Sequence, residues 1–440
     1  MPELAAYPEK PQGLIDLSEH ERMARANEIT AAWRYYDGDM RKPLKVKPGQ
    51  PDDNLIVNMV AKMIEQAVEL LFGAMPAFQL DDDDERSRAE LTLAYLWKVN
   101  RGPVFLNTLA TSGAITGHCF VKVLPTGDPM RPVRFVSLKP EQVSVFWAPD
   151  DIELVQCYMI YWTQGNTEYR EDHVNLGTSW RIVNMMRENS RDWTQTADQL
   201  WLYPWSQIVD WQNLPAARGY YGLSDLRNPA LNDGYNFLAS NTQRIIRYHA
   251  HPRTIGTGFR AGEMSDTSVE AFWTISNPDA KVSNLEMQSD LGSSIAFAQG
   301  VQAQFWSEHR GFDMTSIKDR IGQLTNFGLR VLMADALNKA STKRELYGMG
   351  LQAINRHALE LLGYGADNVT QITWESMLPE NRIEEAQVQQ MLLGMGVTSK
   401  ATAAAALGLD WEQEQQRVED ESESDDNIGS RLLRAFEQGQ

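Results

Sequence analysis

The most unusual pattern of apolar and polar positions lies in the middle of the chain. Residues 223–252 form a long, polar, helix-permissive run, and residues 291–312 form a second one. A run of about 28 residues spans roughly 40 Å as a helix, because each residue adds 1.5 Å. The pattern therefore predicts two long helices joined at one end by the short insert 253–290, as a hairpin.

The first of these helices has only a thin apolar stripe. A helix of this kind is poorly suited to the buried core of a monomer, and better suited to packing beside copies of itself with one polar face in water. The alternative is a surface hairpin on a large monomer. The apolar positions are Leu223, Leu226, Leu231, Tyr235, Leu238, Ile245 and Ile246, and the polar positions between them are Asn228, Asn232, Asn236, Asn241, Thr242 and Gln243.

Four helices are predicted before residue 117. Ser18 and Glu21 form a capping-box pattern that predicts the start of the first helix, which ends at Tyr36. The second is predicted over residues 55–72, where apolar residues recur at steps of three and four. The other two are expected over residues 86–97 and 104–115.

Residues 117–212 change to short runs of β-branched and aromatic residues. Gly, Pro, Asp and Asn separate these runs at a spacing of roughly ten residues, which is typical of an antiparallel meander. After the hairpin, the pattern returns to helix over residues 327–362, with Gly363 in the C-cap position. A short strand is predicted over 371–374, and further helices with an acidic tail follow.

Composition and charge limit the kinds of function that are plausible. The 440-residue chain is long enough for two or three domains, and its 42% hydrophobic content is ordinary for a globular protein. The formal net charge of −18 excludes a simple nucleic-acid binder held by counterion release, because the mean field repels phosphate. No run reaches 18 apolar residues, so we expect a soluble intracellular product with no membrane span.

Candidate ligand and charge clusters are few, and each has an ordinary structural explanation. Asp81 to Asp84 offers oxygen ligands for a divalent cation, but consecutive acids also suit the start of a helix. His249 and His251 are the closest histidine pair and lie at a helix end. Cys119 and Cys157 are too few for a disulfide framework, so we expect buried reduced thiols. The basic cluster is a solvated loop or a contact for nucleic acid or an acidic neighbour; it comprises Arg41, Lys42, Lys45 and Lys47.

Catalytic motifs are absent from the sequence. There is no Gly-Lys dipeptide and hence no Walker A loop, no Gly-x-Ser-x-Gly elbow and no His-Glu-x-x-His pair. The sequence therefore predicts no enzyme and no cofactor.

The order of features resembles a known family. Trp33-x-Tyr35-Tyr36-x-Gly38, followed by Asn54, Asn58, a helix ending at Gly73 and then Pro76, resembles the N-terminal region of portal proteins from tailed double-stranded DNA bacteriophages, of the siphovirus type. The strands from GHCFVKVLP to LVQCYMIYW are similar to the portal wing sheet, and Gly222-Leu-Ser-Asp225 before a long Asn-rich helix is similar to the portal stem. The C-terminal segment MLPENRIEEAQVQQMLLGMGVTSKATAAAALGLDWEQEQQRVEDE also resembles the end of that family.

The resemblance implies an α+β portal fold. Its parts would be a mainly helical body, an antiparallel β wing sheet, a long helical stem hairpin, a small α/β clip and a helical C-terminal crown. The implied domains are the N-terminal arm and wing (1–222), stem helix 1 (223–252), the clip (253–290), stem helix 2 (291–312), the tunnel loop region (313–326), the long wing helix and strand (327–378), and the crown with its acidic tail (379–440).

The resemblance also implies partners and a location. The chain would form a homo-oligomeric ring of about twelve copies at the portal vertex of the virion, after assembly in the host cytoplasm. Double-stranded DNA would pass through its channel. Implied partners are the large terminase, the head-completion adaptor, and the major capsid and scaffolding proteins, with no membrane.

Candidate residues follow from these implied parts. The tunnel loop would present Lys318, Arg320, Gln323 and Asn326 to DNA. The channel-facing candidates of the stem are Asn236, Arg244 and Arg247. The candidates for partner docking at the clip are Arg260, Glu263, Trp273 and Lys281.

Two other classes of protein remain open from sequence. One is a different ring or tube component of a phage or secretion machine. The other is a metal-dependent nuclease that uses Asp81 to Asp84.

Overall fold

The computed structural model consists of two compact units, Met1–Glu375 and Ser376–Gln440. The residues that it describes are 12–49, 51–80, 84–148, 150–189, 192–250, 253–258, 279, 281–285, 291–313, 326–365, 368–378, 382–406, 408, 411 and 414–417. It combines helices with antiparallel sheets, as the predicted α+β class requires.

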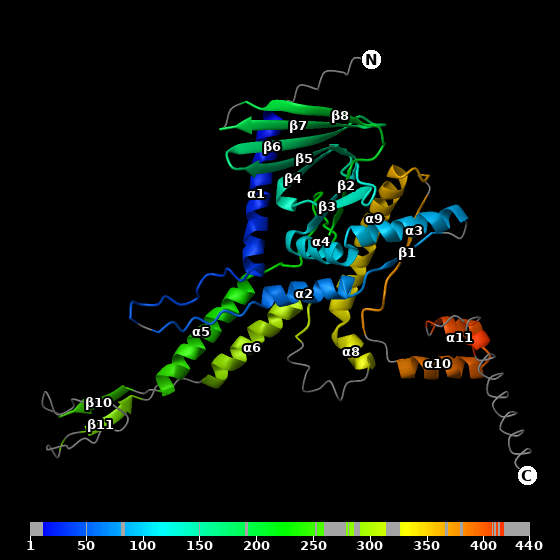
Figure 1. Cartoon of the computed structure of the whole chain (residues 1–440). Helices are drawn as coiled ribbons and strands as arrows, with labels where there is room; N and C mark the ends of the chain where they lie inside the picture. The colour runs from blue at the N-terminus through cyan, green and yellow to red at the C-terminus, as the bar shows by residue number, and fades with distance from the viewer. Residues whose placement is uncertain are drawn as a thin grey trace, which may run out of the picture. The chain divides into compact units, whose positions relative to one another are not determined.

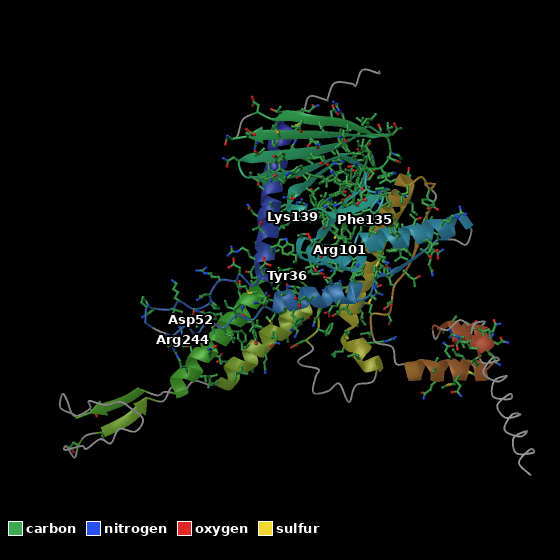
Figure 2. The ribbon with its side chains drawn as sticks, viewed as in Figure 1. Tyr36, Asp52, Arg101, Phe135, Lys139 and Arg244 are labelled. Carbon is green, nitrogen blue, oxygen red and sulfur yellow. The ribbon has the colours of Figure 1, made fainter. Side chains whose placement is uncertain are left out.

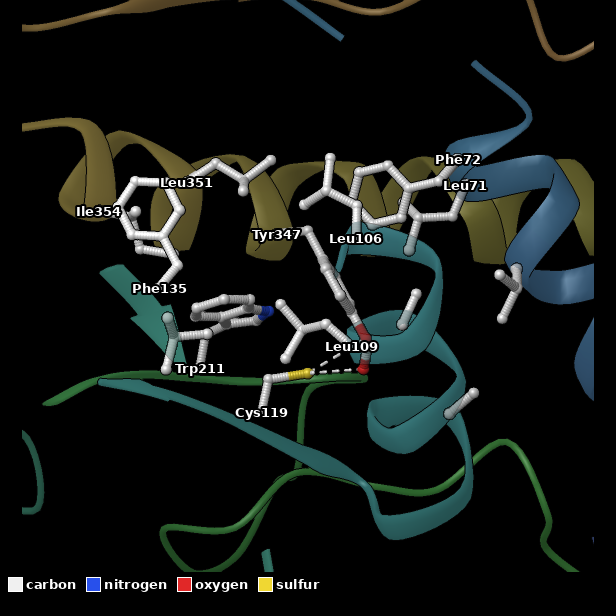
Figure 3. Close-up of a cluster of buried hydrophobic side chains, with 14 of the residues drawn as sticks. Leu71, Phe72, Leu106, Leu109, Cys119, Phe135, Trp211, Tyr347, Leu351 and Ile354 are labelled. Atoms are coloured by element: carbon white, nitrogen blue, oxygen red, sulfur yellow. Dashed lines mark hydrogen bonds between the residues drawn. The ribbon is translucent and has the colours of Figure 1, made fainter. Parts of the chain in front are cut away.

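A helical core forms the centre of the first unit (Figure 1). Most of its helical residues come from α2 (Met59–Phe72), α3 (Asp84–Val99), α4 (Gly102–Thr116) and α9 (Ala334–Leu361). Figure 3 shows Tyr347 of α9 pointing between Leu106, Leu109 and Cys119 in this core. The Tyr347 hydroxyl receives a hydrogen bond from the Cys119 thiol at 3.3 Å and donates one to Asn213 at 3.0 Å, so its polar end is satisfied inside an apolar cluster.

The predicted antiparallel meander is confirmed, and it divides into two sheets. The three-stranded sheet has the order β3-β2-β9, and the five-stranded sheet has the order β4-β5-β6-β7-β8. The strands are β2 (His118–Pro125), β3 (Val133–Ser137), β4 (Val143–Trp147), β5 (Val155–Gln164), β6 (Thr167–Asn175), β7 (Trp180–Glu188), β8 (Thr194–Trp201) and β9 (Ile208–Gln212).

One buried carboxylate joins the two sheets. Asp210 of β9 accepts hydrogen bonds from the hydroxyls of Tyr158 at 2.6 Å and Tyr220 at 2.5 Å, and its Oδ2 lies 2.9 Å from Nε2 of His118. Burial and the neighbouring Asp210 raise the pKa of Tyr158 well above its usual value, so this phenol stays a donor.

Helix α1 (Gln12–Tyr36) runs beside the five-stranded sheet in Figure 1. The Arg25 guanidinium lies 3.7 Å from the centroid of the Tyr221 ring and donates to the carbonyl of Pro140 at 2.5 Å. The predicted capping box is wrong, because the helix begins at Gln12 and Ser18 therefore lies within it. The prediction of a helix from residue 55 also fails at its start, because α2 begins at Met59 with Asn58 as its N-cap.

The predicted helical hairpin is present, with shorter helices. Helix α5 (Ala230–Ala250) and helix α6 (Leu291–Glu308) lie side by side, and strands β10 (Arg253–Thr257) and β11 (Lys281–Leu285) pair antiparallel between them in sequence. Residues 223–229 are not helical, contrary to the prediction. Instead, their backbone is hydrogen-bonded to α4: the Asp225 amide donates to the carbonyl of Ala114 at 2.8 Å.

The long helix predicted after the hairpin is divided in two. Helix α8 (Asn326–Leu332) is separated by the single residue Met333 from α9, which starts at Ala334. Gly363 has a φ of +89°, which suits the predicted C-cap role. The predicted strand is β12 (Gln371–Thr373), which pairs with β1 (Ala77–Gln79).

The second unit contains two described helices, α10 (Arg382–Gly394) and α11 (Lys400–Ala406). The Ser399 hydroxyl accepts a hydrogen bond from the Thr402 amide at 3.1 Å and so caps α11. The acidic tail predicted at the end of the crown region 379–440 lies largely outside the described residues.

Both cysteines are free, Cys119 in the core and Cys157 half-buried. Within the described part of the chain, no helix is both long enough and apolar enough to cross a membrane.

Two glycines of α9 provide a test of the core. A Cβ on Gly350 would lie 2.2 Å from Cε3 of Trp211, whereas a Cβ on Gly348 would meet only Ile372, at 3.9 Å. We expect Gly350→Ala to lower the free energy of unfolding by about 1–3 kcal/mol through overpacking. Gly348→Ala, the matched control, should be neutral or stabilising by up to about 1 kcal/mol, because alanine favours helix. Equal effects of the two substitutions in urea titrations would contradict this packing.

Candidate functional site

The polar face of α5 binds an extended segment of the same chain. We call residues 51–58 the strap. Three backbone amides in and just after the strap donate to α5 side chains: Leu55 to Oγ of Ser240 at 2.9 Å, Val57 to Oδ1 of Asn236 at 2.9 Å, and Met59 to Oδ1 of Asn232 at 3.0 Å.

The spacing of these hydrogen bonds follows from the two backbone geometries. The α5 residues are four apart, which is about 6.0 Å along a helix. The strap residues are two apart, which is about 6.6 Å along an extended chain. The two repeats nearly match, so successive partners meet. Two hydrogen bonds run in the opposite direction, from Asn232 Nδ2 to the Val57 carbonyl at 3.0 Å and from Ser240 to the Leu55 carbonyl at 3.1 Å.

The strap corrects one expectation about α5. The polar face was expected to be in contact with water, but Asn232, Asn236 and Ser240 are all buried. Asn236 was a candidate for facing a channel. Its side chain is only 1% exposed and accepts from the Val57 amide, so it is not available to a water-filled channel.

The two arginine candidates of α5 lie at the far end of the strap. Arg247 Nη2 lies 2.7 Å from Oδ2 of Asp53, and Arg244 Nε lies 3.4 Å from the same atom. Figure 2 shows Arg244 close to Asp52, the residue before Asp53. Both guanidiniums are about one-quarter to one-third exposed, and the buried Asp53 carboxylate compensates part of their charge.

The basic loop that precedes the strap is anchored on the same surface. The Asn54 side chain accepts from the Leu44 amide at 2.7 Å and donates to the Leu44 carbonyl at 3.0 Å. Lys42 pairs with Asp52 at 2.7 Å, and a hydrogen bond from Lys42 lowers the pKa of Asp52 to about 2. Arg41, Lys45 and Lys47 are exposed, which fits the solvated-loop interpretation of this cluster.

A buried charge cluster fixes the start of α5. Asp225 accepts from the ammonium of Lys343, and its Oδ1 lies 3.6 Å from Nζ of Lys339. All three side chains are almost completely buried. Burial opposes ionisation of Asp225, but the two ammoniums outweigh burial and its pKa is lowered. Helix α9 therefore holds the residues that lead into α5 by charge.

The same cluster fixes the end of α6. Lys339 Nζ also donates to the carbonyl of His309, the residue after α6, at 2.8 Å. The His309 ring lies between the two ends of the hairpin: Nδ1 lies 2.7 Å from the Phe305 carbonyl, and Nε2 accepts from the Asn228 amide at 3.3 Å. Burial lowers the pKa of His309, which favours the neutral ring that this arrangement needs. Both ends of the hairpin are thus attached to α9.

Most candidate residues of the tunnel loop and the clip lie outside the described residues. Lys281 is exposed on β11, paired in register with Thr257, and Asn326 is the first residue of α8. The tunnel-loop candidates Lys318, Arg320 and Gln323, and the clip candidates Arg260, Glu263 and Trp273, lie outside the described residues.

The candidate metal ligands also lie mainly outside the described residues. Asp81 to Asp83 and His251 are not described, Asp84 is the first residue of α3, and His249 lies in α5. Among the described residues, no group of three or more His, Cys, Asp and Glu side chains could hold a metal ion.

Sequence reasoning missed Lys339, Lys343 and Asp53. A usable signal existed for the lysines, because they fall on the same stripe of α9 as Ala336, Ala340 and Tyr347. A charge on an apolar stripe indicates a buried partner. Asp53 carried no such signal, since it lies in a polar loop sequence.

The Asp225 cluster makes a prediction about stability and pH. At neutral pH, Asp225→Asn leaves two buried ammoniums without a counter-charge and should cost about 3–5 kcal/mol. Because the folded pKa of Asp225 is lowered, its contribution is fully present above the unfolded carboxyl pKa of about 3.9 and is lost as pH falls through the folded pKa. Urea titrations should therefore show the difference between wild type and variant shrinking below about pH 4.

A double variant controls for general disruption. Asp225→Asn with Lys343→Met removes one of the stranded ammoniums, so it should be more stable than Asp225→Asn alone. A wild-type-to-variant difference that stays constant down to about pH 2 would show that Asp225 is not held as a carboxylate by the lysines.

Comparison with known proteins bears on the identity of this fold. A solved chain described as "Virion of native gene transfer agent (GTA) particle" matches with a TM-score of 0.52 at 13% identity, covering 87% of this chain and 93% of that one. A chain from "Neck of native GTA particle computed with C12 symmetry" matches with a TM-score of 0.47 at 13% identity, covering 79% and 89%. No curated protein sequence matches the chain.

The family comparison is more specific. Residues 15–200 and 310–427 match the family described as "Phage portal protein, SPP1 Gp6-like". These residues are well over half of the 440-residue chain, and they lie on both sides of the α5–α6 hairpin. The chain therefore belongs to the SPP1 Gp6-like family of phage portal proteins.

Proposed function

We propose that about twelve copies of this chain form a closed ring at one vertex of a phage capsid, with a central channel for double-stranded DNA during packaging and ejection. Membership of the portal family is the observation that carries this proposal. The role is structural rather than catalytic, and it needs no cofactor.

The α5–α6 hairpin is the part proposed to form the stem of the ring. Its two ends are attached to α9 through Asp225 and His309, and α5 is attached along its length to the strap. Most of α6 lies outside the core, since only Phe305, Trp306 and the following His309 are fully buried there. A hairpin that is fixed at its base and mostly exposed along α6 suits contact with neighbouring copies.

The charges of the chain suit passage of DNA without tight binding. A net charge of −18 per copy repels the phosphate backbone, which favours sliding over adhesion. The positive charges of Arg244 and Arg247 are partly compensated by Asp53, so these two arginines would attract phosphate only weakly. We assign the remaining transient DNA contacts to the tunnel loop between α6 and α8, through Lys318, Arg320, Gln323 and Asn326.

The proposed partners follow from the position of the ring. The β10–β11 end of the hairpin, with Arg260, Glu263, Trp273 and Lys281, is assigned to docking the large terminase and later the head-completion adaptor. The major capsid and scaffolding proteins would surround the ring, which would assemble in the host cytoplasm and remain in the virion.

Electron microscopy of the purified wild-type protein tests this function. We expect top views of annular particles with a central opening, and native mass spectrometry should give a mass of about twelve copies. Monomers, or particles without a central opening at any protein concentration tested, would contradict the proposal.

A further inference from the structure

The strap presents an apolar surface on the outer side of α5. Leu55, Ile56 and Val57 are exposed by 43%, 38% and 37%, although their backbone is bound to α5. The reason is geometric. The amides and carbonyls of an extended chain point sideways and its side chains point up and down. Because the sideways direction is used for α5, side chains on both sides of the strap stay uncovered.

Helix α6 presents a second apolar surface. It has no Asp, Glu, Lys or Arg from Leu291 to Ser307, although charged residues make up 23% of the chain. Ile295 and Phe297 are exposed by 44% and 63%. A helix that stays in water normally carries charges on its outer face, so this face is suited to being covered.

These two surfaces lie on different sides of α5. Asn232, Asn236 and Ser240 face the strap, whereas Leu231 and Tyr235 pack beside the core cluster that contains Phe305 and Trp306 of α6. At 100° per residue, the two sets of α5 residues point about 120° apart around the helix axis. The strap and the core, to which α6 contributes Phe305 and Trp306, therefore contact different sides of α5.

A closed ring needs two different surfaces on each copy, because its contacts run head to tail. We propose that the apolar strap surface of one copy, Leu55 to Val57, packs against the exposed face of α6, around Ile295 and Phe297, of the next copy. This inference rests on the proposed ring. DNA is a poor occupant for either surface, because phosphate is held by Lys and Arg and these surfaces contain neither.

The hydrogen bonds between the strap and α5, which we call the polar ladder, gain a role from this contact. Without Asn232, Asn236 and Ser240, the strap backbone would need water or another partner for its hydrogen bonds. With them, the strap is held at a fixed height on α5 and presents Leu55, Ile56 and Val57 to a neighbour. The ladder is therefore a positioning device for the interface between copies.

Cysteine cross-linking between copies tests the proposal. Ile56→Cys and Phe297→Cys are placed on separate, differently tagged full-length chains in a Cys157→Ser background, where the remaining Cys119 is buried. After the two chains assemble together and are oxidised, we expect a disulfide-linked dimer that carries both tags. The matched control replaces Ile56→Cys with Leu202→Cys, which is 76% exposed on the loop after β8 and should give no such dimer.

A charge exchange gives an independent readout. Phe297→Glu should abolish annular particles while leaving the thermal unfolding of the chain intact, and Ile56→Lys with Phe297→Glu should restore them. If Phe297→Glu fails to fold, the cross-link still decides.

The outcomes separate this inference from the proposed function. If the wild-type protein forms rings but the Ile56→Cys and Phe297→Cys chains cross-link no more than the Leu202→Cys control, the proposed interface is wrong and the proposed ring is unaffected. Rings that persist in Phe297→Glu while binding to DNA fragments or capsid shells is lost would assign α6 to another occupant, which also overturns it. A wild-type protein that forms no rings overturns both.

Discussion

The hydrogen-bonding requirement of the strap backbone determines how the hairpin is built. An extended segment at the surface needs a partner for its amides and carbonyls, and α5 supplies one at every fourth residue. Because a four-residue helical step nearly equals a two-residue extended step, Asn232, Asn236 and Ser240 each meet a successive strap position. These hydrogen bonds join residues more than 170 positions apart in sequence. They hold the basic loop, the strap and α5 together as one surface.

Buried charged side chains, rather than the hydrogen bonds of the strap, hold the two ends of the hairpin. Asp225 and His309 stand at the two ends of the hairpin, and Lys339 and Lys343 of α9 hold both. Removing a buried charge from its partners is far more costly than breaking an exposed pair, so these contacts resist displacement of the hairpin base. In the proposed ring, the hairpin would therefore keep a fixed base while α6 remains available to a neighbouring copy.

Local signals in the sequence predicted more of the fold than of the site. Strands β2 to β9 were predictable because β-branched runs and turn residues carry their own signal. The strap was not predictable as an extended segment, because Leu55, Ile56 and Val57 match the apolar spacing of α2. Only their contact with α5 keeps them extended. The same contact explains why Asn236 was expected to face a channel, although it is buried. A single sequence does not distinguish a buried asparagine from a solvent-exposed one. Arg244 and Arg247 gave no sign of Asp53, which is nearly 200 residues away.

Amide hydrogen exchange along the strap tests most directly whether α5 holds it. In the wild type, the amides of Leu55, Val57 and Met59 should exchange much more slowly than those of the exposed loop at Lys45 and Lys47. Asn232→Ala should remove protection at Met59 and spare Leu55, whereas Gln243→Ala, at an exposed position of α5, should change neither. Exchange at Leu55, Val57 and Met59 as fast as in the loop would show that the polar face of α5 is in water after all.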